Sequence, residues 1–412
     1  MKKNLSKVLA LLMALVLALG MLSACGGNNS TPDTPAAPSN TDTPSNTDTP
    51  STPDDTNAPS GDPIKIGVLV ADVSGEEALG FRAYYEDYIA PTYNVQFNYT
   101  EQLTDAASEK SAIERFAAQG CQAIISFSSS DRAMQIETCA ANKLYYAVAS
   151  GMLDDAQYEQ YKTNEYFVGQ VGPNMDTEYE AGYAMGKHFA DQGVTSIALY
   201  GAFIPNPMHV YRAAGVIAGI GATYGGASDK DAIVGQIFGD QGVDMSKVAS
   251  NGVELVSYFQ GYGDTTTDEL NAAIQAQPDA FLSVGMATTF FTQQLNTAGI
   301  PFSDIDSFTS GNADAMANGQ LVYLAGKYSS SVGPILAAVI DAVNGNAIRG
   351  EDGSAISVSQ DYLVATDSAS FDKYYTADKG DSPIYNKDLL DTVIGSGISY
   401  SDFQAFVEAD RS

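Results

Sequence analysis

The residue types that carry most nucleophilic and metal-binding chemistry are scarce in this chain. It has three cysteines, Cys25, Cys121 and Cys139, and two histidines, His188 and His209. So small a set offers few ligands for a dedicated transition-metal site, and we expect neither a metal nor a cofactor. Cys121 and Cys139 could form a disulfide outside the cell, or they could be the small buried thiols common in α/β folds. Both interpretations fit the sequence.

Motifs of several enzyme classes are missing from the sequence. There is no Gly-x-Ser-x-Gly turn of an α/β-hydrolase and no His-Glu-x-x-His zinc motif. Gly186-Lys187 and Gly326-Lys327 lack the upstream glycine and the hydroxyl of a phosphate-binding loop. We therefore predict that the protein is not an enzyme. The many carboxylates leave a secreted carbohydrate-active enzyme as an alternative, because glycoside hydrolysis needs only a carboxylate pair.

The N-terminal segment has the character of a secretory signal that ends at Cys25. Three early lysines precede an apolar run, Val8 to Leu22, which is shorter than the roughly 20 residues of a membrane span. Leu22-Ser23-Ala24-Cys25 resembles the lipobox of bacterial lipoproteins. The resemblance implies cleavage after residue 24 and attachment of diacylglyceryl and a further acyl chain, such as palmitate, to Cys25. The alternative is an ordinary signal peptide with a chance cysteine.

Residues 25–62 are predicted to be the lipidated cysteine and a tether. The segment consists mainly of Thr, Pro, Ser, Asn and Asp, and the hexapeptide Ser39 to Pro44 is repeated at Ser45 to Pro50. It has too few apolar side chains to bury the surface that folding requires. We expect a semi-extended linker that holds the folded part away from a bilayer.

The charge of the chain excludes one class of partner. The formal net charge is -30, and loss of residues 1–24 would remove three lysines and no acids, which leaves -33. Nucleic acid binding requires a basic face, so we expect no nucleic acid partner. The same charge disfavours contact of the folded part with anionic lipid and favours solubility.

From residue 63 onward, apolar β-rich runs alternate with helical patterns, and this segment is long enough for two lobes. The expected strands are 64–70, 95–99, 123–127, 144–148, 166–169, 196–200, 253–259, 280–284 and 321–325. The clearest helix is 332–344, whose apolar residues recur at helical spacing. The tail from about residue 370 is rich in Tyr and Asp, and we expect it to end in a short helix that begins at Ser401. Such alternation predicts parallel sheets covered by helices on both faces.

This order of elements resembles the type I solute-binding proteins of bacterial uptake systems, the family of the ribose- and galactose-binding proteins. Three pieces between residue 64 and about 365 carry the resemblance. They are the first strand with Gly67 and the following Phe81, the segment Val171 to Asp176 leading into Glu180-Ala-Gly182, and Ala325 to Ser331 followed by an apolar helix. The second and third resemble the crossovers between two lobes.

The resemblance implies a fold of two Rossmann-like, doubly wound parallel-sheet lobes joined by a three-stranded hinge. We expect a first lobe of residues 63–170 plus about 328–350, and a second lobe of 171–327 plus about 351–412. It also implies a monomer on the outer face of the cytoplasmic membrane that binds a small polar solute, such as a sugar, and delivers it to an ABC permease. A nucleoside, as in the related basic membrane lipoproteins, is the alternative ligand.

Ligands of open α/β sheets bind beyond the carboxyl ends of the strands, so the candidate contacts follow the strands. In the first lobe they are Asp72, Ser74, Phe81, Ser128, Ser129, Asp131, Ser150 and Gly151, and in the second Phe203, Asn206, Tyr262 and Met286. The family resemblance adds Arg212 as an arginine that grips a sugar hydroxyl, Asn312 and Asp314 near the family's ligand-binding aspartate, and Lys327 near a polar hinge residue.

Some candidates also have local interpretations, and the sequence departs from the sugar-binding pattern. Ser128 could cap the following helix, Phe81 could belong to the core, and Arg212 could pair with a surface acid. The Asn-Asp expected after strand 280–284 is replaced by Gly285-Met286-Ala287, and the chain has no tryptophan to stack on a sugar ring. A small polar solute other than a hexose or pentose is therefore also compatible with the sequence.

Overall fold

The computed structural model describes residues 61–409 except 72, 104, 129, 130, 205, 262 and 264. All of these described residues belong to one compact unit. Cys25, the signal segment and the tether lie outside the described residues, as do the candidate contacts Asp72, Ser129 and Tyr262. Among the described helices, none has the length and apolar character needed to cross a membrane.

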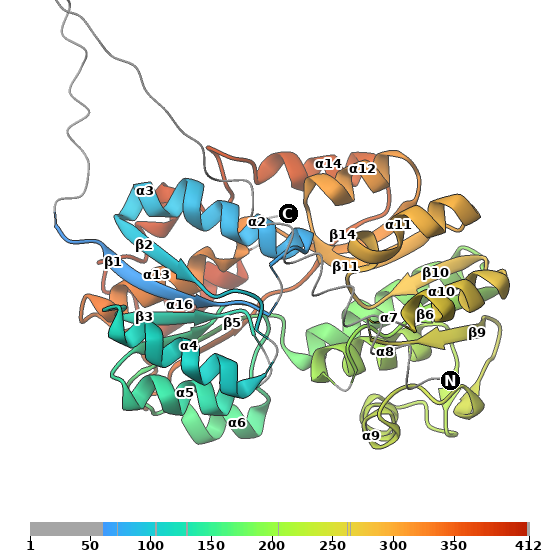
Figure 1. Ribbon diagram of the computed structural model, residues 1–412, viewed down its shortest axis with the longest axis horizontal. Helices are drawn as coiled ribbons and strands as arrows, with labels where there is room; N and C mark the ends of the chain where they lie inside the picture. The colour runs from blue at the N-terminus through green and yellow to red at the C-terminus, as the bar shows by residue number, and fades with distance from the viewer. Residues whose placement is uncertain are drawn as a thin grey trace, which may run out of the picture. The chain divides into compact units, whose positions relative to one another are not determined.

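The first lobe is built on a fully parallel sheet with the strand order β13-β5-β4-β3-β1-β2 (Figure 1). Its strands are β1 (Ile64–Leu69), β2 (Val95–Tyr99), β3 (Ala123–Ser126), β4 (Tyr145–Val148), β5 (Phe167–Gly172) and β13 (Ile356–Ser359). Its helices are α2 (Glu76–Ala83), the π-helix η1 (Tyr84–Ile89), α3 (Ala90–Tyr93), α4 (Ala106–Ala118), α5 (Arg132–Ala141), α6 (Asp155–Tyr161), the 3₁₀ turn η3 (Ser329–Val332), α13 (Gly333–Val343), α15 (Lys387–Leu390) and α16 (Tyr400–Glu408).

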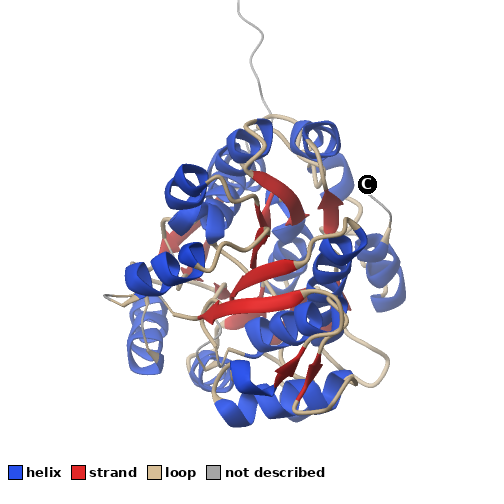
Figure 2. Ribbon diagram, turned by 90° about the vertical axis from the view of Figure 1, so that its right-hand side faces the viewer, coloured by secondary structure: helices blue, strands red, loops and turns tan. Residues whose placement is uncertain are grey.

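The second lobe repeats this plan with the order β14-β12-β11-β10-β6-β9, in which only β14 runs antiparallel to its neighbour among the described strands. Its strands are β6 (Ser196–Tyr200), β9 (Glu254–Phe259), β10 (Ala280–Ser283), β11 (Phe302–Ser307), β12 (Leu321–Lys327) and β14 (Leu363–Ala365), with a separate antiparallel pair of β7 (Thr223–Tyr224) and β8 (Val248–Ala249). Its helices are α7 (Met175–Asp191), α8 (Pro207–Gly219), α9 (Lys230–Asp240), the 3₁₀ turn η2 (Met245–Lys247), α10 (Thr266–Gln275), α11 (Ala287–Ala298), α12 (Ser310–Ala317) and α14 (Ser368–Ala377). Figure 2 shows helices flanking its strands.

The predicted alternation of strands and helices is confirmed in both lobes. The apolar helix expected at 332–344 is α13, whose side chains from Gly333 to Ala342 are all buried and which packs on β4 and β5. The last helix begins at Tyr400, one residue earlier than expected. Its cap is Ser399, whose hydroxyl accepts a hydrogen bond from the Asp402 N–H at 3.1 Å, so Ser401 is not the cap.

The sequence analysis missed the central strand β11 because its polar residues do not follow the pattern of a buried strand. The segment Phe302-Ser-Asp-Ile-Asp-Ser307 is nevertheless buried throughout, between β10 and β12. Ser303 and Asp304 are fully buried, and the Ser283 hydroxyl donates to Asp304 at 2.9 Å. A strand that breaks the hydrophobic rule in the middle of a sheet is a typical mark of a functional site.

Three segments connect the lobes where the family resemblance expects crossovers. They lie between β5 and α7, between β12 and α13, and between β13 and β14. We expected residues 351–412 in the second lobe, but the structure places β13 in the first-lobe sheet and α16 against β13. The chain after β14 therefore returns to the first lobe, with only α14 on the second.

Candidate functional site

The most polar buried group of the second lobe is built around Arg212 on α8. Its Nε donates to Glu178 on α7 at 2.6 Å, and one terminal nitrogen donates to the Val284 carbonyl after β10, also at 2.6 Å. The other terminal nitrogen donates to the hydroxyl of Tyr362 at 2.6 Å. Burial disfavours the charge of Arg212, but the Glu178 carboxylate and Tyr362 offset this and raise its pKa. Arg212 therefore stays a cation, and each of its three side-chain nitrogens donates a hydrogen bond.

Tyr362 brings the hinge into this group, because it lies in the crossover between β13 and β14. Its hydroxyl lies 3.1 Å from Glu178 Oε2, and burial raises its pKa well above 10. Arg212 also sits 5.6 Å from the centre of the Tyr362 ring. Arg212 is thus held by a buried acid and the hinge, so the alternative interpretation as a partner of a surface acid is wrong.

A second ion pair connects the two lobes directly. Lys327, the last residue of β12, places its Nζ 2.5 Å from Glu77 Oε1 on α2 and 3.3 Å from the Ser150 hydroxyl after β4. The same ammonium lies 5.7 Å from the Phe81 ring centre and 5.6 Å from that of Tyr362. Lys327 is only 8% exposed, so the second lobe, the first lobe and the hinge meet at this one side chain.

The polar strand β11 supplies acids to the same region. Burial, the neighbouring Asp304 and the charge of Glu77 raise the pKa of Asp306 well above its usual value. The side-chain amide of Asn312 donates to Asp306 at 3.3 Å and to the Ser307 carbonyl at 2.7 Å. The Asn312 side-chain oxygen is buried without a protein hydrogen-bond partner. Asn312 thus keeps an acceptor that nothing within the described chain satisfies.

Arg132 completes the group from the first lobe. Its terminal nitrogens donate to the Met152 carbonyl at 2.5 Å and to the Ser150 carbonyl at 3.0 Å, while its buried Nε has no hydrogen-bond partner. Burial lowers the pKa of Arg132, and the charge of Glu178 in the other lobe acts in the opposite direction. Arg132 joins the cluster through Ser150, whose hydroxyl lies 3.3 Å from Lys327 Nζ.

A cavity of about 440 Å³ lies beside this cluster, between the start of α2 and helices α11 and α12. It is lined by Ser74 and Glu76 from the first lobe and by residues that include Thr288 and Asp314 from the second. The Glu76 carboxylate accepts a hydrogen bond from the Gly311 N–H at 3.2 Å. The two lobes thus touch on one side of the cavity, and most of the residues that line it have polar side chains.

Four predicted contacts therefore meet in the interlobe cluster, and two line the cavity beside it. Phe81, Arg212, Asn312 and Lys327 belong to the cluster, whereas Ser74 and Asp314 lie in the cavity wall. Phe81 is also core, since it is 3% exposed and stacks on Phe127 at 5.3 Å. The interpretation of Phe81 as a core residue is confirmed, and its contact with a ligand stays a prediction.

Other predicted contacts have structural partners instead. Asp131 caps α5 by accepting from the Met134 N–H at 2.9 Å, and Asn206 caps α8 by accepting from the Met208 N–H at 3.1 Å. Met286 has a left-handed backbone and begins α11, half-buried. Phe203 is 40% exposed, and its ring lies 6.1 Å from that of His209.

Ser128 is part of a network inside the first lobe. Its hydroxyl donates to the buried Glu109 of α4, and Gln135 donates to the same carboxylate at 2.8 Å. Gln135 in turn accepts from the Ser126 hydroxyl and from Tyr146, both at 2.7 Å. Cys121 and Cys139 are free, buried thiols, so the disulfide interpretation is wrong. The described residues hold no group of three His, Cys, Asp or Glu side chains arranged for a metal.

Sequence analysis missed five members of the cluster, namely Glu77, Arg132, Glu178, Asp306 and Tyr362. Arg132 directly follows the predicted Asp131, and the polar residues of β11 break an apolar pattern, so these two had a signal in the sequence. Glu178 and Glu77 are ordinary acids in the first turn of a helix. Tyr362 is one of 24 tyrosines, and only the crossover places it beside Arg212.

Comparison with solved structures identifies the fold. The periplasmic binding protein of an arabinose ABC transporter from Shewanella sp. ANA-3 matches with a TM-score of 0.54 and 16% identity, over 76% of this chain and 95% of its own. A myo-inositol-bound ABC transporter solute-binding protein from Bacillus halodurans C-125 matches with 0.54 and 15%, over 77% and 99%. A D-allose-bound protein from Actinobacillus succinogenes 130z matches with 0.56 and 13%, over 75% and 99%.

These similarities and the two parallel-sheet lobes establish the type I periplasmic-binding-protein fold predicted from the sequence. Comparison with models of protein families gives no match. Comparison with the sequences of curated proteins gives none either. What the site binds must therefore be argued from its own chemistry.

Proposed function

We propose that the protein is a lipid-anchored extracytoplasmic receptor that captures a sugar between its two lobes and delivers it to an ABC permease. The observation that carries the proposal is the convergence of both lobes and the hinge on one polar cluster. Arg212 reaches Glu178 and the hinge Tyr362, while Lys327 reaches Glu77 and Ser150 of the other lobe. Ligands of open α/β sheets bind at this end of the strands.

The chemistry of the cluster suits a polyol. Carboxylates and the Asn312 side-chain oxygen can accept hydrogen bonds from sugar hydroxyls, while the guanidinium and ammonium groups can donate them. Phe81 and Tyr362 offer ring faces for the apolar side of a sugar, as tryptophan does elsewhere. The solved structures of this fold named above contain arabinofuranose, myo-inositol and D-allose, all of them polyhydroxylated rings. A sugar is therefore the ligand that the cluster and the fold favour together.

Transport fits the placement of the cluster across the hinge. A ligand that contacts both lobes stabilises the closed arrangement and thereby changes the surface that a permease meets. The predicted lipid on Cys25 and the tether of residues 26–62 would keep this receptor, as a monomer, on the outer face of the cytoplasmic membrane. The family resemblance, and not the cluster itself, supports the permease as partner.

A thermal-shift screen of monosaccharides, cyclic polyols, nucleosides and amino acids tests the ligand class. A sugar at 100 times its dissociation constant should raise the free energy of unfolding by about 2.7 kcal/mol. The K327A variant should lose this stabilisation. The matched variant K187A, which removes an exposed ion pair with Asp191 on α7, should keep it.

The outcomes of the screen separate the alternatives. Stabilisation by nucleosides alone would support the alternative ligand, a nucleoside as in the basic membrane lipoproteins, in place of a sugar. Consumption of a stabilising sugar would instead indicate a carbohydrate-active enzyme. If no small polar solute shifted the melting temperature, the receptor proposal would fail. Anchoring is tested separately, because C25S should move the protein from the detergent phase to the aqueous phase.

A further inference from the structure

The C-terminal tail crosses between the lobes a fourth time. Helix α14 packs on the second lobe, where the rings of Phe371 and Tyr374 lie 5.4 and 5.0 Å from the ring of Phe308. Helices α15 and α16 pack on α13 and β13 of the first lobe, and Phe403 is fully buried there. In Figure 1, α14 lies beside α12, and α16 lies with the first lobe. We call residues 378–386, between these anchors, the C-terminal crossing.

The C-terminal crossing is tied near both of its ends to one of the other crossovers. The Asp378 carboxylate accepts hydrogen bonds from the Ser330 N–H at 3.0 Å and from the Ile384 N–H at 2.8 Å. The Ser330 hydroxyl also donates to Asp378 and accepts from the Tyr385 N–H at 3.2 Å. Ser330 is fully buried in η3, which connects β12 to α13. A hinge motion at Ser330 must therefore carry the C-terminal crossing with it.

The first-lobe end of the crossing is also held by hydrogen bonds, which come from tyrosines of η1. The Tyr84 hydroxyl donates to the Tyr385 carbonyl at 2.6 Å, and the Lys387 N–H donates to the Tyr88 hydroxyl at 2.7 Å. Gly333 permits this close approach, because a Cβ there would lie 2.6 Å from the Tyr84 hydroxyl and 3.0 Å from Tyr385. Tyr84 and Tyr88 belong to η1, which follows α2 directly. The crossing is thus fixed to the first lobe beside the helix that carries Glu77.

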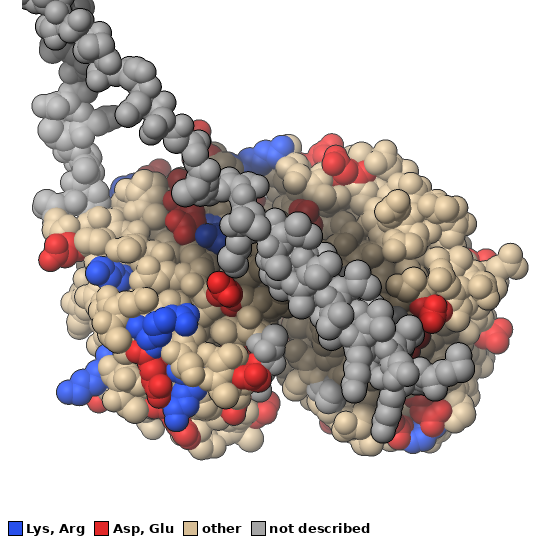
Figure 3. Space-filling view, in the orientation of Figure 1, with Lys and Arg blue, Asp and Glu red and all other residues tan. Residues whose placement is uncertain are grey.

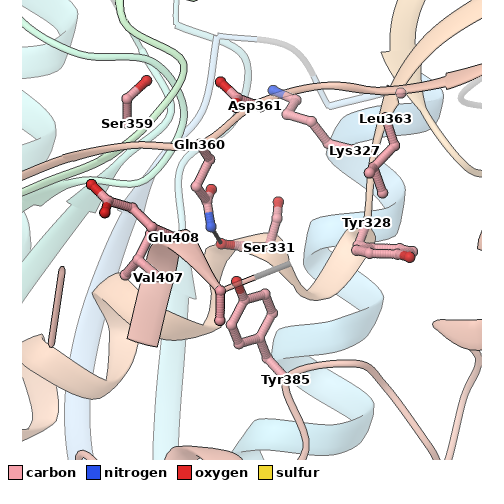
Figure 4. Close-up of a pocket in the computed structure, with 12 residues that line it drawn as sticks. Lys327, Tyr328, Ser331, Ser359, Gln360, Asp361, Leu363, Tyr385, Val407 and Glu408 are labelled. Carbon is pink, nitrogen blue, oxygen red and sulfur yellow. Dashed lines mark hydrogen bonds between the residues drawn. The ribbon is translucent and has the colours of Figure 1, made fainter. Parts of the chain in front are cut away.

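Three of the four crossings surround one cavity of about 380 Å³ (Figure 4). Tyr328 and Ser331 come from the second crossover, Gln360 from the third, and Tyr385 from the C-terminal crossing. Gln360 donates to the Ser331 carbonyl at 3.2 Å, which joins two of these walls. Movement of any one segment must change this cavity and the hydrogen bonds around it.

The match covers nearly the whole length of each solved structure named above, but it leaves part of this chain unmatched. The myo-inositol-binding protein is covered over 99% of its length but covers only 77% of this one. Residues 1–60 are about a seventh of the 412 residues, so further segments also lie outside the match. An additional C-terminal segment is consistent with that excess.

We propose that the C-terminal crossing limits how far the two lobes open. Three crossovers alone form a flexible hinge, because a few backbone torsions can absorb the motion. A fourth segment, anchored on both lobes and tied at Ser330, adds a covalent limit to the separation. Opening beyond that limit requires the Asp378 hydrogen bonds to break or α14 or α15 to detach. The receptor should therefore open less widely than a hinge of three crossovers alone would allow, whatever solute it binds.

The test compares a released crossing with an intact one in the protein without added solute. The released variant combines D378A with eight Gly and Ser residues inserted between Gly380 and Asp381, in an exposed turn. The control D367A removes a cap of the same tail within one lobe, where Asp367 accepts from the Ser370 N–H at 2.8 Å. Small-angle scattering reports the separation of the lobes, and hydrogen exchange reports on the crossovers.

The released variant should shift to a larger radius of gyration and exchange at least about tenfold faster in the segments 327–332 and 359–363. D367A should leave both measurements unchanged. Unchanged dimensions and exchange in a folded released variant would overturn the proposal. If that variant does not fold, D378N takes its place in the same two measurements. Its amide keeps the shape of the side chain and one acceptor, so this variant should still fold. No solute is used, so the result is independent of the proposed sugar specificity.

Discussion

The two lobes share a plan but treat buried charge differently. In the first lobe, Glu109 is buried among neutral partners of the same lobe, Ser128 and Gln135. In the second lobe, Glu178 is paired with Arg212, and the pair reaches the hinge through Tyr362. The charged surface differs as well, since the face seen in Figure 3 shows acidic and basic side chains together over the first lobe and a large uncharged area over the second.

This difference indicates which of the two buried groups depends on the conformation of the hinge. The hydrogen bonds of Glu109 with Ser128 and Gln135 lie within one lobe, so opening of the cleft leaves them intact. The Arg212 group depends on the crossover residue Tyr362, and burial, Asp304 and the charge of Glu77 in the other lobe raise the pKa of Asp306. Of these two groups, the Arg212 group is therefore the one whose hydrogen bonds include the hinge.

The largest effect is expected from R212M, which leaves Glu178 buried without its cation. Breaking a buried pair costs about 3–5 kcal/mol, whereas replacing both partners with apolar residues is often neutral. R212M should therefore lower the free energy of unfolding by that amount, and R212M/E178M should recover much of it. Urea unfolding measures both. A loss below about 1 kcal/mol in R212M would show that the pair does not govern the second lobe.

A smaller loss is expected from E109A in the first lobe. The Ser128 hydroxyl and the Gln135 amide would lose a buried acceptor, which costs about 1–3 kcal/mol. Since this network does not reach the hinge, hydrogen exchange of segment 359–363 should stay at the native rate while the melting temperature falls. Faster exchange in that segment would erase the proposed contrast between the lobes.

A pH effect is expected from the second lobe, where both histidines lie. Burial and the nearby Arg212 lower the pKa of His209 from 6.5 to about 3, and the Phe203 N–H donates to its Nδ1 at 3.1 Å. The unfolded chain then binds the proton more readily, so the free energy of unfolding should fall as the pH drops from about 6.5 toward 3. This contribution should reach about 1 kcal/mol at pH 5.5.

The variant H209N keeps an acceptor for the Phe203 N–H but cannot titrate in this range. Chemical denaturation between pH 7.5 and pH 4.5 should therefore give a flatter profile for H209N than for the native protein. Parallel profiles would mean that His209 is not buried as a neutral imidazole.

The smallest effect is expected from E77Q, which removes the charge that Lys327 meets across the cleft. Because Glu77 is 35% exposed, solvent screens the pair and its loss should cost at most about 1 kcal/mol. Stability should change little, but exchange at the start of α2 should rise because one interlobe contact is weakened. E159Q, which removes an exposed partner of Lys162 within the first lobe, is the control and should leave α2 unchanged.

Much of the architecture was determined by the sequence alone. Apolar runs such as Ile64–Leu69 and the stripe of α13 specify buried strands and a core helix wherever they fold, because burial of their side chains is the main driving force. The length of the chain indicated two lobes, and the resemblance to the type I solute-binding proteins indicated the place of the first two crossovers. The family resemblance pointed to Arg212 and Lys327, and the structure places both in the interlobe cluster.

The tertiary structure decided how the site is assembled and where the tail ends. Glu178 and Tyr362 are 184 residues apart, and their contact exists only because a crossover returns beside α7. Asp131 and Asn206 follow strands just as binding residues would, but local N–H groups use them as caps. Hydrophobic periodicity reports which side of an element is buried. It carries no information about which distant polar partner will satisfy a buried charge, and that partner defines the site.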